Sequence, residues 1–429
     1  MSIKNICARE ILSSGSTPSI EVKCVLESGV IGIASVPYGA SAGIHEAYVL
    51  LDNDFTRYMG KGMLRAVENV NAIISKRLIG MDAFDQRHID ETMISLDGTE
   101  NKSNLGANAI LGVSMAVARA AANEKEIPLY QYIRKTYDLP IERYILPNPM
   151  FVVIEGGKHA DNSTDLQEYL LSVIGDVSVK ENVRCGIEIY LTLKTVLKER
   201  GYNVNVGNEG AFAPSGISDN ELPLQIILEA IKKSGYEAGK DVGISIDAAA
   251  SEFYKDGKYH LKIEEKEFDS AQLIEYYLQW FKKYPIITTE DMLDQDDWKA
   301  WIILTEQSLV PNIGDDLTVT NVKRLQKALD GKAINAILIK LNQIGTLTET
   351  VDCCMLAREN GLMTVISHRG GGETNDTSMI DLAVAVNAGF VKVGPSRGER
   401  VEKYNRLMEI EDELGDMANV AGHNFREIV

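Results

Sequence analysis

The chain has 429 residues, of which 45% are hydrophobic and 25% are charged, a balance that is ordinary for a soluble globular protein. This length supplies enough apolar surface for a large core, and we expect two domains. The formal net charge of −18 argues against nucleic acid or an anionic membrane as the main partner. An anionic substrate would therefore need local cations, supplied by metal ions and a few placed Lys and Arg side chains.

The N-terminal stretch MSIKNICARE lacks the apolar run of a secretory signal, and no run approaches the roughly 18 apolar residues that span a bilayer. The five cysteines show no metal-ligand spacing, and their odd number indicates reduced thiols. We therefore expect a cytoplasmic protein with no membrane partner. The adjacent Cys353 and Cys354 could form a redox pair, although two small residues on a helix is the interpretation we favour.

The first part of the chain shows the pattern of a β-hairpin followed by a glycine-rich loop. In SIEVKCVLE apolar and polar residues alternate, and VIGIASV returns after a turn at Ser28-Gly29, which predicts a hairpin over residues 19–36. The loop PYGASAG (37–43) follows directly.

Helical patterns dominate the rest of this part, from about 62 to 80 and from 104 to 123. The second stretch is apolar nearly all round, which predicts a buried helix. The helical period is lost near 138–146, where prolines become frequent. Strands followed by helices predict a small α+β domain over residues 1–138.

From there to residue 429 the pattern changes to short apolar runs with helix-compatible stretches between the later ones. Such alternation predicts parallel βα units. The runs are MFVVI (150–154), YLLSVI (169–174), VGISI (242–246), PIITT (285–289), INAILI (334–339), LMTVI (362–366) and GFVKV (389–393).

Ionisable residues stand at or near the ends of such runs, at spacings of 43, 25, 25, 28 and 24 residues: Asp247, Glu290, Asp315, Lys340, His368 and Lys392. A spacing near 25 fits one strand, one helix and two loops. Residues at the C-terminal ends of successive parallel strands meet at one mouth of a (β/α) barrel, where such barrels place their active sites. The alternative, six unrelated solvated loop residues, explains the common register less well.

Three carboxylates from three strands suit Mg²⁺, which prefers oxygen ligands, and the lack of a nearby Cys/His cluster argues against zinc. Lys340 has two interpretations. It could be a salt-bridge partner of the carboxylates, or a general base whose pKa is lowered by the metal and by Lys392. A lysine base beside divalent cations suits removal of a proton from the carbon next to a carboxylate.

The chain resembles the enolase family over essentially its full length, and this pairing of base and metal is already described for that superfamily. Several motifs in the family's order make the resemblance specific. It implies a small α+β N-terminal capping domain over residues 1–138, followed by a (β/α)8-type TIM barrel over residues 139–429. The motifs are YGASAGIHEA (38–47), SNLGANAILGVSMAVARA (103–120), EGGKHA (155–160), DLQEY (165–169), VGNEG (206–210), IDAAASEFY (246–254), TEDMLDQDDW (289–298), GDDLTVTN (314–321), ILIKLNQIGT (337–346) and SHR (367–369).

The resemblance implies two magnesium ions in each active site. One ion is held by three carboxylates, and Ser41 in the glycine-rich loop helps bind the second, which arrives with the substrate. The three implied carboxylate ligands are Asp247, Glu290 and Asp315.

The resemblance also implies the remaining roles. Lys340 is the base, and Glu209, assisted by Glu168, is the acid that helps hydroxide leave. The implied pocket and substrate-binding residues are His159, Gln167, Arg369 for the phosphate, Gly370 beside it, Lys392 for the carboxylate, and His368.

The reaction implied is the reversible dehydration of 2-phosphoglycerate to phosphoenolpyruvate by a carbon–oxygen hydro-lyase of glycolysis and gluconeogenesis. A homodimer is implied, and a fraction at the cell surface is possible without a signal. Two alternatives stay open. One is a paralogue with a related substrate, such as a carboxyphosphoenolpyruvate synthase of phosphonate biosynthesis. The other is a non-catalytic, structural or surface-binding protein.

Some positions depart from the family's pattern near the expected acid. Glu155 replaces an asparagine and Lys158 replaces a small residue, so that they could form a local ion pair or Lys158 could meet an extra anionic group of a larger substrate. Asn208 replaces an aspartate beside Glu209, which should change the pKa of that glutamate. Met292 replaces a proline.

Other departures concern the phosphate side and the dimer. Tyr38 replaces a serine, either packing on the outer face of the loop or altering its closure. Gly370 replaces a serine whose hydroxyl joins the arginine at the phosphate, and one further glycine is inserted. Glu409 stands where an arginine usually pairs across the dimer with the residue matching Glu21, so that the usual dimer contact is in doubt.

Overall fold

The structure, a computed structural model, describes residues 1–39 and 42–428. Its N-terminal part is an antiparallel three-stranded sheet in the order β1 (Ile3–Leu12), β2 (Pro18–Leu26), β3 (Ile31–Ser35). The predicted hairpin is confirmed as β2 and β3, with Gly29 at φ 90° in the turn. Strand β1 was not predicted, because it lies at the sheet edge and shows no regular alternation of buried and exposed residues.

The helices that pack on this sheet or follow it are α1 (Leu64–Glu68), α2 (Ser75–Leu78), α3 (Gln86–Asp97), α4 (Ala107–Glu124) and α5 (Leu129–Thr136). The helix expected over 62–80 exists, but a π-helical segment over Asn69–Ile74 separates α1 from α2. Helix α4 is buried along almost its whole length, as predicted. It contacts β3 so closely that a Cβ at Gly32 would lie 2.2 Å from the backbone oxygen of Ala116.

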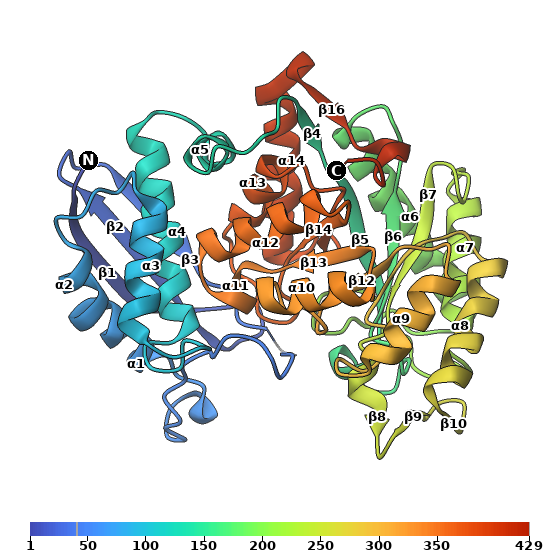
Figure 1. The fold of residues 1–429 in the computed structure, drawn as a ribbon. Helices are drawn as coiled ribbons and strands as arrows, with labels where there is room; N and C mark the ends of the chain where they lie inside the picture. The colour runs from blue at the N-terminus through green and yellow to red at the C-terminus, as the bar shows by residue number, and fades with distance from the viewer. Residues whose placement is uncertain (40–41, 429) are drawn as a thin grey trace.

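The second part is a closed barrel of eight strands, which confirms the fold class (Figure 1). Around the barrel the order is β11 (Ile286–Glu290), β12 (Asn312–Gly314), β13 (Ala336–Ile339), β14 (Met363–Ser367), β15 (Phe390–Val393), β5 (Asn148–Glu155), β6 (Glu168–Val173) and β7 (Val242–Asp247).

The expectation of uniformly parallel strands is wrong for β6, which is antiparallel to both β5 and β7. The segment between β5 and β6 holds no α-helix, so the chain reverses direction instead of crossing over. Strand β12 was not found among the apolar runs, because it has only three residues. The other barrel strands coincide with those runs.

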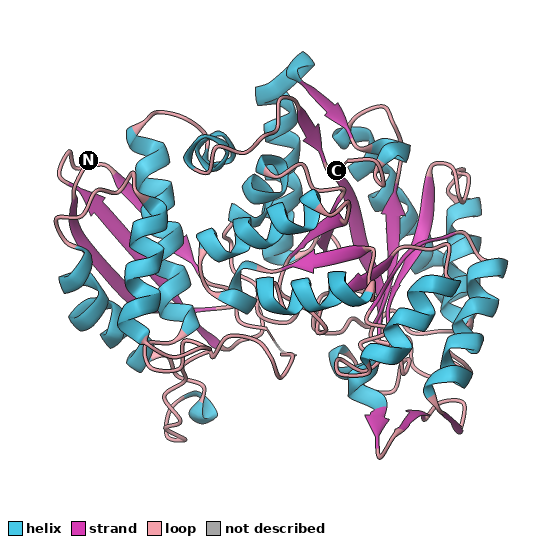
Figure 2. Ribbon diagram, in the orientation of Figure 1, coloured by secondary structure: helices cyan, strands magenta, loops and turns pink. Residues whose placement is uncertain are grey.

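Helices surround the barrel strands on the outside (Figure 2). The helices that follow β6 and β7 are α6 (Val179–Glu199), α7 (Leu222–Lys233) and α8 (Ser270–Lys283). The later ones are α9 (Trp298–Gln307), α10 (Val322–Gly331), α11 (Leu341–Ile344), α12 (Leu347–Glu359), α13 (Ser378–Ala385) and α14 (Val401–Leu414). Small additions are a sheet of β8 (Tyr254–Lys255), β9 (Lys258–Leu261) and β10 (Lys266–Phe268), and a pair of β4 (Tyr144–Leu146) and β16 (Ala418–Val420).

Side chains of the barrel strands alternate between two apolar clusters. Met150 and Val152 of β5 belong to one cluster together with Leu338 of β13, whereas Phe151 and Val153 belong to the larger cluster shared with the helices. This alternation is expected because successive side chains of a strand point to opposite faces. The barrel interior is therefore a packed core, and the polar groups are confined to the strand ends.

Buried polar contacts join the two parts of the chain. The Ser114 hydroxyl of α4 accepts the backbone N–H of Leu347 at 3.0 Å, and Asp90 of α3 accepts that of Thr348 at 3.0 Å, both at the start of α12. Burial raises the pKa of Asp90 to about 6. Cys353 and Cys354 lie buried in the same helix as free thiols. In the described part of the chain, no helix combines the length and apolar character needed to cross a membrane.

Candidate active site

A polar pocket with an empty volume of about 480 Å³ lies at the strand ends of the barrel. Among the site residues expected from the sequence, those that line it are His159, Gln167, Glu168, Glu209, Asp247, Asp315, Lys340, His368, Arg369, Gly370 and Lys392. Glu290 does not line the pocket, but it is buried and contacts the lining residue Lys392. Ser41 lies outside the described residues.

The three expected metal ligands end neighbouring strands, β7, β11 and the turn after β12. Asp247 and Glu290 stand opposite each other in the parallel register of β7 and β11. Each is buried, and one carboxylate oxygen of Glu290, Oε1, has no hydrogen-bond partner among the described residues. An all-oxygen donor set with an unsatisfied buried acceptor fits Mg²⁺.

Lys392 neutralises this carboxylate group. From β15 its Nζ lies 2.7 Å from Glu290, 2.8 Å from Glu168 and 2.9 Å from Asp247. Burial alone would lower the pKa of Lys392, but these carboxylates hold it well above its usual value. Lys392 is therefore a fixed cation at the bottom of the pocket.

Lys340 follows β13, and its Nζ lies 2.5 Å from Asp315. Burial, Arg369 and Lys392 act to lower the pKa of Lys340, as the sequence suggested for Lys392. Among the protein groups alone, the ion pair with Asp315 outweighs them, so that the pKa of Lys340 stands above its usual value. The expected lowering of this pKa by the metal stays a prediction. The observed position of Lys340 Nζ is compatible with both interpretations of this lysine, as an ion-pair partner and as a base.

Two histidines flank the carboxylate of Glu209. His159 Nδ1 lies 3.2 Å from Oε1, and His368 Nε2 lies 3.2 Å from Oε2. Although burial acts to raise the pKa of Glu209, the two histidines hold it well below its usual value. Burial raises the pKa of the adjacent Glu168 to about 8. The buried cluster therefore places a carboxyl group of lowered pKa beside one of raised pKa.

The structure corrects the expected ion pair between Glu155 and Lys158. Lys158 is half-exposed and pairs with Glu252 at 2.5 Å, whereas Glu155 is completely buried behind His159 and Glu209. The reason is local geometry: Glu155 ends β5, and Lys158 lies in the turn beyond it, facing outward. The side chain of Asn208 is exposed, and Met292 is buried in the apolar core.

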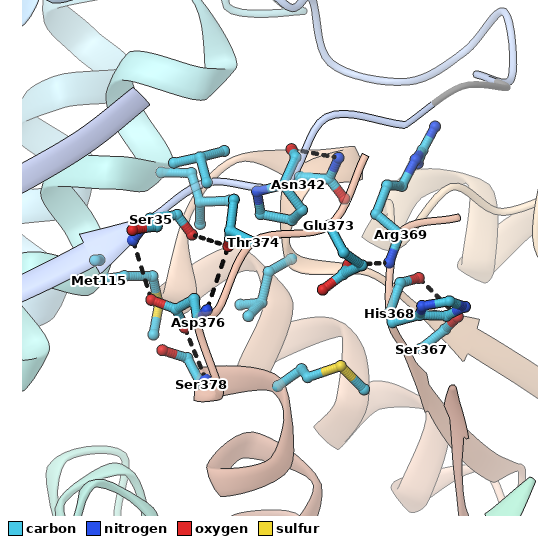
Figure 3. A pocket seen from close by; sticks show the side chains of 16 residues that line it. Ser35, Met115, Asn342, Ser367, His368, Arg369, Glu373, Thr374, Asp376 and Ser378 are labelled. Atoms are coloured by element: carbon cyan, nitrogen blue, oxygen red, sulfur yellow. Dashed lines mark hydrogen bonds between the residues drawn. The ribbon is translucent and has the colours of Figure 1, made fainter. Parts of the chain in front are cut away.

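Arg369 joins the barrel mouth to the N-terminal part of the chain. Its Nη2 lies 2.8 Å from Glu46, and its backbone N–H donates to Glu373 at 2.6 Å. Figure 3 shows Glu373 beside a second cavity, between α4, the strand end of β14 and the segment that follows β3. The other oxygen of Glu373 pairs with buried Lys403 at 2.7 Å, which fixes this segment.

The glycines after Arg369 permit close packing that a side chain would block. A Cβ at Gly370 would lie 1.8 Å from Glu209 Oε1, so that a serine does not fit there in this arrangement. A Cβ at Gly372 would lie 1.5 Å from the backbone oxygen of Tyr38, whose N–H donates to the Gly372 oxygen at 2.8 Å. Tyr38 is half-buried against the apolar core, rather than on an outer face.

Sequence reasoning missed four acidic residues that line the pocket: Glu46, Glu252, Asp291 and Asp316. Asp291, Asp315 and Asp316 offer oxygens that all lie within 4.8 Å of one another, a second group able to hold a cation. Burial raises the pKa of Asp316 to about 7. The motifs TEDMLDQDDW and GDDLTVTN contain both aspartates directly after the expected ligands, which was the available signal.

Comparison with protein families agrees with this geometry over both parts of the chain. The family model for the enolase N-terminal domain matches residues 3–133, and the model for the enolase C-terminal TIM barrel domain matches residues 143–429. The chain belongs to the enolase family. Its barrel and pocket are therefore those of an enolase-type lyase, a family that generally uses Mg²⁺ and small phosphorylated acids.

Proposed function

We propose that the protein is a phosphopyruvate hydratase, which dehydrates 2-phosphoglycerate reversibly to phosphoenolpyruvate. The observation that carries this proposal is that one pocket is lined by Lys340, the Glu209 cluster and Lys392. A base, an acid and a cation for the substrate carboxylate are the groups that loss of water next to a carboxylate requires.

Asp247, Glu290 and Asp315 would hold the tighter Mg²⁺, and Ser41 would contribute to a second ion that arrives with the substrate. When bound, Mg²⁺ neutralises the carboxylates and stabilises the negative charge that develops on the substrate's carboxylate. Lys392 lies 2.7 Å from Glu290, so that it would bind the substrate carboxylate beside the ligands.

Lys340 takes the proton from C2 of the substrate. To act as a base its Nζ must be neutral, and the buried cations Arg369 and Lys392 favour that state. Asp315, 2.5 Å away, opposes it and orients the ammonium group after proton transfer. The pocket is polar and recessed, which restricts access of bulk water to the base.

Glu209 donates the proton with which hydroxide leaves C3 as water. His159 and His368 lie within 3.2 Å of its two oxygens, so that either can resupply the proton. Glu168 shares the same buried cluster and contacts Lys392, linking the acid to the carboxylate end of the pocket. Gln167 also lines the pocket, and Arg369 binds the phosphate beside Gly370.

The test is Mg²⁺-dependent formation of phosphoenolpyruvate from 2-phosphoglycerate, together with exchange of the C2 hydrogen with deuterated water. Lys340→Ala should abolish both, whereas Lys323→Ala, an exposed lysine, should change neither. Normal C2 exchange by Lys340→Ala would refute the base. No turnover and no exchange by the unaltered protein would favour a non-catalytic enolase-like protein.

A related substrate is the second candidate, and the packing at Gly370 favours it. In an enolase that binds a phosphate through arginine and serine, the hydroxyl contributes a donor that this chain cannot place there. Exchange or turnover with a phosphonate acid, such as the substrate of a carboxyphosphoenolpyruvate synthase, but not with 2-phosphoglycerate would decide for this candidate.

We further propose that the protein forms a homodimer without the usual salt bridge. Glu21 pairs with Arg9 at 2.8 Å, and Glu409 pairs with Arg406 at 2.7 Å. Each acid thus has a cation within its own chain, which reduces the repulsion expected between them. Sedimentation equilibrium tests this proposal, and a monomer at micromolar concentration would exclude it.

A further inference from the structure

Glu155 is a buried carboxyl group that the proposed mechanism does not use. It is the last residue of β5 and stands opposite Glu168 in the antiparallel register of β5 and β6. Its exposed fraction is 0%, and it does not belong to the residues that line the pocket. A buried carboxyl that touches no solvent and no substrate costs stability unless neighbouring groups compensate for it.

The carboxyl group of Glu155 contacts the acid cluster. Glu155 Oε2 accepts the backbone N–H of Glu209 at 3.1 Å and lies 3.9 Å from His159 Nδ1. Its other oxygen, Oε1, is buried, and the part of the chain that the structure describes offers it no hydrogen-bond partner. A Cβ at Gly207 would lie 2.6 Å from Glu155 Cδ, so that the loop carrying Glu209 packs directly on this carboxyl group.

The charged groups around this site define its electrostatics. Glu155, Glu168 and Glu209 face His159, and His368 faces the far oxygen of Glu209. Burial alone would lower the pKa of His159, but the three carboxylates raise it to about 9. Burial raises the pKa of Glu155 to about 8. At the loop that carries Glu209, the Tyr190 hydroxyl of α6 donates to the Gly210 oxygen at 2.9 Å, and the charged Arg400 donates to the Asn208 oxygen at 3.2 Å.

We propose that Glu155 is a positioning residue for the acid, which anchors the Glu209 backbone and keeps a proton on His159 in reach of Glu209. The inference rests on the proposed function. During turnover the proton moves from His159 Nδ1 to Glu209 Oε1, 3.2 Å away, and leaves with hydroxide as water. His159 then regains a proton from bulk water.

The replacement of the family's asparagine by Glu155 therefore changes the function of this position. An asparagine could accept the same N–H but carries no charge. As the pH rises and Glu155 ionises, its negative charge favours protonated His159, so that the acid stays loaded in alkaline solution. The family's asparagine would not extend the activity in this way.

The experiment compares Glu155→Gln, which keeps the shape and removes the charge, with the unaltered protein. The chain has only six histidines, so the titration of His159 can be followed by NMR without substrate. We expect the midpoint of the His159 titration to be lower by about one pH unit in Glu155→Gln than in the unaltered protein. The signals of exposed His88 in the same spectra should give the same midpoint in both proteins. The alkaline limb of kcat should shift in the same direction, and Glu199→Gln, at an exposed ion pair, should shift neither.

An unchanged His159 midpoint in folded Glu155→Gln overturns the proposal, and so does a kcat lowered equally at every pH. Glu155→Asn, which inserts the family's residue, provides a second variant if the first does not fold. Because the NMR titration needs no substrate, the two proposals fail separately. Lack of turnover by the unaltered protein would overturn the proposed function even if the midpoint moves.

Discussion

Arg369 and Glu46 form a buried ion pair, with Nη2 2.8 Å from Oε1, that connects the barrel mouth to the N-terminal part of the chain. The same oxygen of Glu46 accepts the backbone N–H of Gly43 at 2.9 Å. A Cβ at Gly39 would lie 1.8 Å from Arg369 Nε, so the arginine packs directly on that backbone. The proposed phosphate-binding residue therefore contacts the backbone at Gly39 directly and is linked to that at Gly43 through Glu46.

Removing this ion pair should change substrate binding and turnover in opposite senses. Glu46→Gln keeps an acceptor for Gly43 but leaves Arg369 without that negative charge. We expect KM for 2-phosphoglycerate to fall, because the phosphate no longer competes with Glu46 for Arg369. We expect kcat to fall about threefold to tenfold, because the connection between the barrel mouth and the N-terminal part of the chain is weaker. Steady-state kinetics measure both.

The neighbouring His45 gives a matched control, because it forms only a partly exposed contact with Asp296 at 3.1 Å. His45→Gln should leave KM and kcat within twofold of the unaltered values. Unchanged constants in Glu46→Gln would show that this ion pair does not control access to Arg369.

Restoring the family's serine at position 370 should harm the enzyme. Its Cβ would lie 1.8 Å from Glu209 Oε1 and 2.9 Å from His159 Cε1. We expect Gly370→Ser to lower kcat at least about tenfold and to destabilise the fold by about 1–3 kcal/mol, as other overpacked sites do. Gly331→Ala is the control, since its Cβ would have its nearest neighbour at 3.4 Å. A serine variant with tighter phosphate binding and normal kcat would contradict the packing argument.

Lys158 should contribute little to catalysis. Its side chain is 53% exposed and pairs with Glu252, and such surface pairs are worth about 0.2–1 kcal/mol. We expect Lys158→Ala to change KM for 2-phosphoglycerate by less than about twofold. Arg369→Lys, which loses the planar guanidinium, should raise KM strongly in the same assay. A large KM increase in Lys158→Ala would instead support an extra anionic group on the substrate.

The fold could be predicted where the pattern of apolar and polar residues within a single strand or helix shows which of its faces is buried. The hairpin of β2 and β3 follows from the alternation of apolar and polar residues with a period of two. The buried helix α4 follows from a nearly continuous apolar stretch. The reversed direction of β6 could not be predicted, because strand direction depends on the connection and not on the apolar run itself. Strand β12 has three residues, too few to show any period.

For the site, the spacing of strand ends predicted that the ionisable residues lie together, but it did not predict which of them form pairs. Lys158 follows Glu155 by three residues, yet the first faces solvent and the second is buried in the acid cluster. Glu46 was missed because its partner, Arg369, is 323 residues away. Sequence spacing reports such contacts only when both residues occupy equivalent ends of repeated elements.

Asp90, which joins the two parts of the chain, should make stability depend on pH. Its pKa is about 6 in the folded protein, against an ordinary value of 3.8, so the folded state binds this proton more tightly. Stability from this group is therefore present at low pH and is lost as the pH rises through 3.8 to 6, by about 3 kcal/mol.

Asp90→Asn cannot ionise but can still accept the Thr348 N–H. Urea unfolding should show the variant gaining stability relative to the unaltered protein between pH 4.5 and 7.5, while exposed Asp330→Asn shows no such trend. A difference that stays constant with pH would mean that Asp90 ionises in the folded protein as easily as in the unfolded chain.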